Sequence, residues 1–135
     1  MDREAIARAL TERGIHASAQ RLAIADYVLA TKDHPSADRV FEVVRSRTPA
    51  ISRATVYNTL NLLVREGLLR QLVLSEGRVV FDPHVEPHHH FIDDATGTIH
   101  DVPWDALEVR HVGELRGLDV REYQVVLRGT RRRPR

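Results

Sequence analysis

Apolar residues recur at helical spacing in four segments of the first 65 residues. The pattern predicts helices over residues 2–13, 19–30 and 53–65, and another between Ser36 and Pro49. Ser18, Ser36 and Ser52 stand where helix N-caps are expected, because a side-chain oxygen can accept from the first free N–H groups. Gly14 and Gly67 follow two of the segments, as is typical of helix ends.

The spacing changes after Gly67, where two β-rich runs cover residues 68–74 and 78–81. Ser75-Glu76-Gly77 separates the runs, and a Gly-containing turn between two such runs predicts a hairpin. Helices closed by a two-stranded wing form the winged-helix type of helix-turn-helix. In that arrangement the fourth helix would lie in the major groove of DNA.

The rest of the chain predicts a second, smaller piece. Strands are expected at residues 91–92, 98–102 and 123–127, with a helix over 105–115. The predicted class is α+β, an N-terminal winged helix plus a small C-terminal α/β dimerisation domain. We place the DNA-binding domain at 1–82, a hinge with two prolines at 83–87 and the metal-binding dimerisation domain at 88–135. Such a thin piece has reason to pair with a copy of itself, which predicts a homodimer.

Charge and composition narrow the class of protein. Residues 1–81 carry 12 Arg and Lys against nine Asp and Glu, and residues 82–135 carry eight against ten. A mildly basic first part suits a polyanion, and an acidic second part with most of the histidines suits a cation. The absence of cysteine excludes disulfides, thiolate zinc sites and iron–sulfur clusters. No apolar run approaches a membrane span, so no membrane partner and a cytoplasmic location are expected.

The polar face of the fourth predicted helix suits the reading of DNA bases. Asn pairs with adenine through two hydrogen bonds, and small or methyl-bearing side chains pack on thymine methyl groups. A solvated helix face is the alternative, and the adjacent wing favours DNA contact. Arg21 is placed to touch phosphate. The predicted DNA-facing residues are Arg53, Ala54, Thr55, Asn58, Thr59 and Asn61, with Tyr57 at the edge.

The run His88-His89-His90 is the strongest sign of metal binding. On a strand, alternation places His88 and His90 on one face and His89 on the other. Two imidazoles so placed can chelate Fe(II), Mn(II), Zn(II) or Ni(II). Asp82 and Asp101 could add carboxylates, and His34 a third imidazole. The alternative is a surface histidine cluster without a metal.

Six motifs in this order resemble the Fur superfamily of metalloregulators, over nearly the whole chain. The resemblance implies a regulatory metal site on His34, Asp82, His88, His90 and Asp101, DNA contacts from Arg53 to Asn58, and dimerisation by sheet pairing. A metal bound by both the DNA-binding domain and the dimerisation domain would set the angle between the two DNA-binding domains of a dimer. The motifs are Ser18-Ala19-Gln20-Arg21, His34-Pro35-Ser36-Ala37-Asp38, Ser52 to Leu60, Phe81-Asp82, His88 to Phe91 and Gly97 to Asp101.

The chain departs from the family pattern in its cysteines. Many members hold a structural zinc with two Cys-x-x-Cys pairs, and the first pair's positions are Asp93 and Thr96 here. A structural four-cysteine zinc is therefore excluded. A second, weaker family site would fall on His89 and a helical Glu108, with Tyr123 in place of its further histidine.

The leading hypothesis is a metal-dependent DNA-binding transcription repressor of metal homeostasis or peroxide stress genes, acting on an AT-rich palindromic operator. Fe(II) or Mn(II) is the expected metal, with Zn(II) as another choice. The cysteine-free form resembles the haem-responsive Irr branch, and Asp101 resembles the peroxide-sensing PerR branch. The haem alternative stays open, although the Cys-Pro haem motif of some Irr proteins is absent. An enzyme is not expected, because no nucleophile or Gly-rich motif accompanies the histidines. A metal-buffering or protein-binding module is the third alternative.

Overall fold

The computed structural model describes residues 2–74 and 77–132, which fall into two compact units, Met1–Val85 and Glu86–Arg135. Ser75 and Glu76 of the predicted turn, and the last three residues of the basic tail, lie outside the described residues. No helix in the described part of the chain is long and apolar enough to cross a membrane. We describe each unit by itself.

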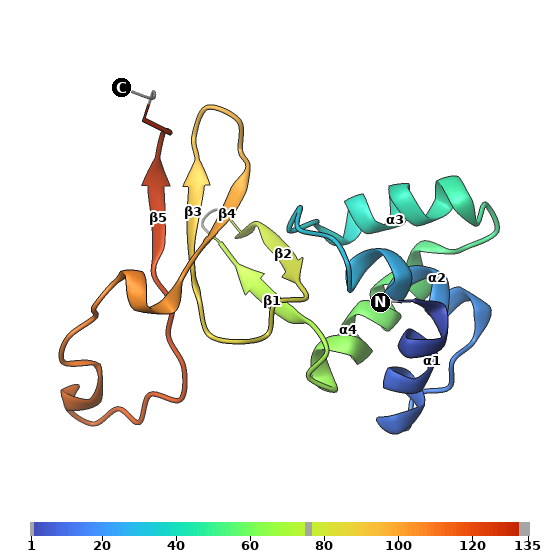
Figure 1. Ribbon diagram of the computed structural model, residues 1–135, viewed down its shortest axis with the longest axis horizontal. Helices are drawn as coiled ribbons and strands as arrows, with labels where there is room; N and C mark the ends of the chain where they lie inside the picture. Colours follow the sequence, from blue (N-terminus) through green and yellow to red (C-terminus); the bar gives the residue numbers. More distant parts are fainter. Residues whose placement is uncertain (1, 75–76, 133–135) are drawn as a thin grey trace. The chain divides into compact units, whose positions relative to one another are not determined.

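Unit 1 contains the four predicted helices (Figure 1). Ser18, Ser36 and Ser52 are the N-caps of the last three, each accepting a hydrogen bond from the backbone N–H three residues on. The capping oxygens satisfy donors that a helix leaves unpaired at its start. The helices are α1 (Arg3–Glu12), α2 (Ala19–Val28), α3 (Ala37–Arg47) and α4 (Arg53–Arg65).

The apolar stripes of these helices meet in one core. Ile24, Val40, Val56 and Leu60 are completely buried. Each comes from a helical stripe, because residues three and four apart lie on the same side of a helix. Phe81 joins this cluster from the second strand of the wing, so the wing packs on the helices through an apolar side chain.

The end of α4 starts the wing. Gly67 has a φ of +77° and follows the C-cap Glu66. Its N–H donates to the carbonyl of Val64, and the Leu68 N–H donates to that of Leu63, which is the Schellman pattern that favours glycine. Strands β1 (Arg70–Val73) and β2 (Val79–Asp82) then pair antiparallel.

Unit 2 is a three-stranded sheet of order β4–β3–β5 (Figure 1). Strand β3 (His89–Asp93) pairs antiparallel with β4 (Ile99–Val102) and parallel with β5 (Val126–Gly129). The last strand starts later than the 123–127 expected. Its pairing with β3 begins where the His90 N–H donates to the carbonyl of Val125.

The helix expected over 105–115 is wrong. That stretch holds two short 3₁₀ turns, Trp104–Ala106 and Val112–Glu114, and no α-helix is found among the described residues of unit 2. The apolar stripe finds no core to cover, since Val109 and Leu115 are exposed. A short helix without packing is marginal in water, and the Gly113 within it weakens it further. The α+β class and the winged-helix order are otherwise confirmed.

Candidate metal centre and nucleic-acid interface

His34 and Asp82 form one candidate ligand pair within unit 1. The Nε2 atom of His34 lies 3.2 Å from Oδ2 of Asp82, and both side chains are buried. The other carboxylate oxygen, Oδ1, accepts from the His84 N–H at 2.9 Å. The pair therefore presents one imidazole nitrogen and one carboxylate oxygen side by side.

Loop geometry brings this pair together across a long stretch of sequence. His34 lies between α2 and α3 with a φ of +50°, a region that residues other than glycine seldom adopt. The next residue, Pro35, accepts a hydrogen bond from the Phe81 N–H at 2.9 Å. Because this bond joins the loop to β2, the residue after Phe81 faces His34. Residues with such uncommon backbone angles cluster at functional sites, where the surrounding structure holds them in place.

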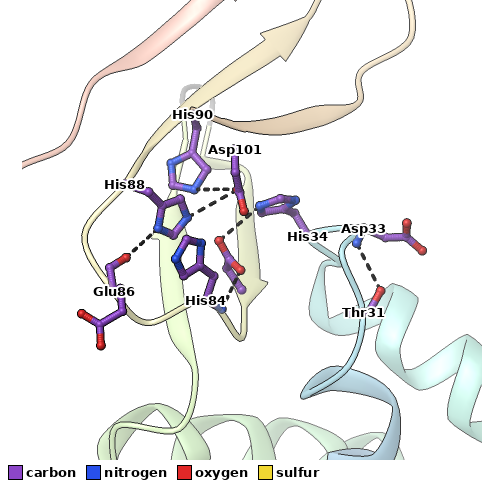
Figure 2. A network of polar contacts seen from close by, with 9 residues as sticks. Thr31, Asp33, His34, His84, Glu86, His88, His90 and Asp101 are labelled. Carbon is purple, nitrogen blue, oxygen red and sulfur yellow. Dashed lines mark hydrogen bonds and ion pairs between the residues drawn. The ribbon is translucent and has the colours of Figure 1, made fainter. Parts of the chain in front are cut away.

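His88, His90 and Asp101 form a second ligand group within unit 2 (Figure 2). Their donor atoms lie within 4.8 Å of one another. Oδ1 of Asp101 is 3.4 Å from Nε2 of His88 and 3.7 Å from Nε2 of His90. The two imidazole rings are 4.5 Å apart, so they share one face of the strand as alternation predicts. Asp101 joins them because it pairs with His90 in the β3–β4 register.

A backbone contact sets the orientation of the His88 ring. Its Nδ1 lies 2.7 Å from the carbonyl oxygen of Glu86, which can only accept, so Nδ1 carries the proton (Figure 2). The lone pair of a neutral imidazole then lies on Nε2, the atom that faces Asp101. Metal-binding histidines in proteins are commonly oriented by such a second contact.

Both groups have the donor chemistry of a site for a divalent first-row metal. Imidazole nitrogen and carboxylate oxygen suit Fe(II), Mn(II) and Zn(II). The buried side chains limit the access of water, and Asp101 is about two-fifths exposed, which leaves a route to solvent. With no cysteine in the chain, no four-cysteine zinc site exists.

The second predicted metal site, His89 with Glu108, has a different environment. The His89 ring stacks on Trp104 at 4.6 Å, and its Nδ1 accepts from the Val125 N–H at 2.9 Å. The Tyr123 ring lies 4.8 Å from the Trp104 ring. Glu108 is exposed and belongs to no helix, which corrects the helical position expected for it. Only Nε2 of His89 is left for a ligand.

The predicted DNA face of α4 is exposed at most of its positions. Arg53, Ala54, Tyr57 and Asn58 are exposed, and Thr55 is half-buried. Thr59 is a correction, because it is 4% exposed and lies among the core-facing residues. Arg21, at the start of α2, donates from Nη1 to the carbonyl of His16 at 3.0 Å.

Sequence reasoning missed the role of Asp38, in the first turn of α3. Its Oδ1 accepts from the Tyr57 hydroxyl at 2.8 Å and from Nη1 of Arg53. The bond to Asp38 raises the pKa of Tyr57, because the carboxylate favours the protonated phenol. Asp38 ends the motif of residues 34–38, but an acidic residue in the first turn is also ordinary helix chemistry, so the sequence assigns it no contact of its own.

Comparison with known proteins identifies the family. The ferric uptake regulator family pattern matches residues 12–128. The peroxide operon regulator of Bacillus subtilis is 32% identical over 99 residues, covering 73% of this chain and 68% of that protein. The peroxide-responsive repressor of Staphylococcus epidermidis is 30% identical over 99 residues, covering 73% of this chain and 66%, just under two thirds, of its own length.

Solved structures agree with the fold. The Vibrio cholerae ferric uptake regulator has a TM-score of 0.75 at 23% identity, covering 93% of this chain and 98% of its own. A zinc-bound manganese uptake regulator has a TM-score of 0.69 at 25% identity, covering 92% and 96%. Similar structures are described with manganese and with iron. These relatives are regulators and not enzymes. The chain therefore belongs to the ferric uptake regulator family.

Proposed function

We propose that the chain is a metal-dependent transcription repressor in which His34, Asp82, His88, His90 and Asp101 hold one divalent cation. The observation that carries the proposal is the pair of incomplete ligand groups, two donors in unit 1 and three in unit 2. First-row cations with such ligands commonly take four to six, so neither group alone fills a coordination sphere of that size with protein atoms.

The chain itself limits how far apart the two groups can move. Asp82 ends β2, and His88 directly precedes β3, so only residues 83–87 separate them. Six extended residue steps span at most about 20 Å. Binding of one cation by both groups would remove the freedom that this short connection leaves. We assign 1–82 to DNA binding, 83–87 to the hinge and 88–135 to metal binding and dimerisation.

The DNA-binding role is assigned to α4, with Arg53, Ala54, Thr55, Tyr57 and Asn58 facing an AT-rich palindrome and Arg21 facing phosphate. What supports it is the winged-helix order with an exposed polar α4 face. A palindromic operator requires two DNA-binding domains at a defined spacing. The cation would favour DNA binding because it reduces the range of orientations that the two DNA-binding domains of a dimer can adopt.

A homodimer is supported by the surface of unit 2. Leu115, Leu118, Val120 and Leu127 are exposed, while its buried apolar core is small. Strands β4 and β5 are the outer strands of the sheet and offer backbone groups to a second copy. Light scattering coupled to size exclusion tests this assignment, and a monomer at micromolar concentration would contradict it.

DNA binding is tested by fluorescence anisotropy with an AT-rich palindromic duplex and a scrambled duplex, with and without Mn(II), at fixed salt. Metal should tighten binding to the palindrome about 5- to 150-fold, the usual range of coupling between two sites. His34→Ala and His90→Ala remove one ligand from each group, and both should abolish the metal effect. His100→Ala is the matched control, because that ring faces Phe91 instead.

The outcomes separate the parts of this proposal. If only His90→Ala matters, unit 2 binds the metal alone and the shared site is wrong. If the wild-type protein prefers neither duplex in either metal state, the repressor role is wrong.

Peroxide sensing is a second candidate, favoured by the two similar regulators of peroxide response. The relevant chain residues are imidazoles near a carboxylate, such as His34 beside Asp82. Peptide mass spectrometry of Fe(II)-loaded protein after hydrogen peroxide should find one added oxygen atom on His34 or His88. Mn(II)-loaded protein is the control. Unmodified histidines with iron bound would count against peroxide sensing and leave metal sensing in place.

A further inference from the structure

Asp38 connects two of the side chains that the proposed function assigns to DNA. The same carboxylate oxygen, Oδ1, accepts from the Tyr57 hydroxyl and from Nη1 of Arg53. We propose that Asp38 is a positioning residue for DNA recognition, which holds Arg53 and Tyr57 in one arrangement and disfavours sequence-independent phosphate contacts. This inference rests on the proposed DNA-binding role of α4.

The geometry holds Arg53 from two directions. Its guanidinium carbon lies 4.5 Å from the centre of the Phe41 ring, a cation–π distance. Phe41 is buried in the core of unit 1, so the ring is a fixed support. Oδ1 of Asp38, in the first turn of α3, accepts a hydrogen bond from Nη1 of Arg53. Phe41 lies on the same helix. A long side chain that would otherwise sample many rotamers is thereby restricted.

The pair is open to solvent, since the side chains of Arg53 and Asp38 are 59% and 64% exposed. Exposed ion pairs contribute little to folding stability. The main consequence of this contact is therefore the position of the two α4 side chains and the charge that surrounds them. An exposed position also lets DNA reach both groups.

A guanidinium has five N–H donors, and the Asp38 contact uses Nη1 alone. The remaining donors can pair with the two acceptors of a guanine or with another base edge. The Tyr57 oxygen can still accept a hydrogen bond while its proton is donated to Asp38.

Charge accounts for the second part of the proposal. Sequence-independent binding depends on Arg and Lys neutralising phosphates, and the carboxylate of Asp38 bears the same charge sign as a phosphate. Asp38 therefore competes with a DNA phosphate for Arg53, and its negative charge repels that phosphate. Removing the charge should favour all DNA sequences, and should help the non-operator sequences most.

The test compares Asp38→Asn with Glu42→Gln in the Mn(II)-loaded 135-residue protein. Asparagine keeps the size of Asp38 and loses its charge. Glu42 is a similarly exposed acid on α3 that pairs with Arg39 of the same helix at 3.1 Å, so Glu42→Gln controls for net charge. Affinities for the palindromic and scrambled duplexes are measured over a range of KCl concentrations.

For Asp38→Asn, binding to the scrambled duplex should tighten about 3- to 10-fold, with a salt slope steeper by roughly one released counterion. The ratio of palindrome to scrambled affinity should fall several-fold. Glu42→Gln should change both duplexes in the same proportion. Equal specificity ratios in the two variants would overturn the role of Asp38. Absence of wild-type palindrome binding would instead overturn the proposed function.

A DNA-free measurement tests the contact itself. Ultraviolet titration of the tyrosines, with Tyr57→Phe to identify the Tyr57 signal, reports the pKa that Asp38 raises. Asp38→Asn should lower that pKa toward its ordinary value, and Glu42→Gln should leave it unchanged. A Tyr57 titration that is identical in wild type and Asp38→Asn would overturn the proposal whatever the DNA results.

Discussion

The two units differ in what fills their interiors. In unit 1, most of the buried side chains are apolar and come from all four helices and the wing, and the buried polar ones among the described residues are His34, Thr59 and Asp82. In unit 2, only Ile92 and Ile99 are buried apolar residues among those described, while His88, His89 and His90 are almost fully buried. Apolar burial stabilises a fold without further partners, whereas buried imidazoles require hydrogen bonds or a metal to offset lost hydration.

The two interiors differ in chemistry, because apolar side chains dominate that of unit 1 and imidazoles are the largest fully buried side chains of unit 2. Unit 1 has a core that supports its helices in the absence of any ligand. In unit 2, histidine rings occupy buried positions that apolar side chains usually fill in small domains. A cation that binds its folded form would stabilise it by mass action. Three predictions test this comparison.

The largest effect is expected in the core of unit 1. Leu60 is completely buried, and Leu60→Ala should lower the free energy of unfolding by about 2–5 kcal/mol. The cause is lost apolar contact together with the cavity left behind. Urea unfolding followed by circular dichroism measures the change. Val109→Ala in unit 2, at an exposed side chain outside the proposed dimer surface, should change it by less than about 0.5 kcal/mol. Similar losses in the two variants would contradict the comparison.

Metal should act most strongly on unit 2. Mn(II) at about 100 times its dissociation constant should raise the free energy of unfolding by about 2.7 kcal/mol. Hydrogen exchange should slow most at β3 and β4, and least in the core amides of α4. His90→Ala should remove the effect, with His100→Ala as its matched control. An equal slowing in α4 and β3 would show that stability is not divided between the units in this way.

A smaller effect is expected at the start of α4. The Ser52 hydroxyl accepts from the Thr55 N–H at 3.1 Å, and Ser52→Ala should cost about 1 kcal/mol. Ser46→Ala is the control, because Ser46 is exposed and its hydroxyl donates to the carbonyl of Val43 within α3. Thermal unfolding of both variants measures the difference. Equal stability of the two would mean that core packing alone holds the start of α4.

The sequence was sufficient wherever the deciding physics is local. The helices and their serine caps follow from apolar spacing and from oxygen atoms three residues before an N–H. Strand alternation likewise placed His88 and His90 on one face, as their ring separation of 4.5 Å confirms. The helix expected over 105–115 failed for a nonlocal reason, because Val109 and Leu115 of its apolar stripe stay exposed and pack into no core of the described part of unit 2.

Local pattern alone determined that imidazoles and carboxylates are available as metal ligands and that α4 has one apolar and one polar face. Only the tertiary structure decided that the loop of His34 adopts a positive φ beside Asp82, and that Asp38 of α3 reaches Arg53 and Tyr57 of α4. These contacts join residues far apart in the chain. Their geometry depends on packing and on backbone bonds such as Phe81 to Pro35, which no periodicity encodes.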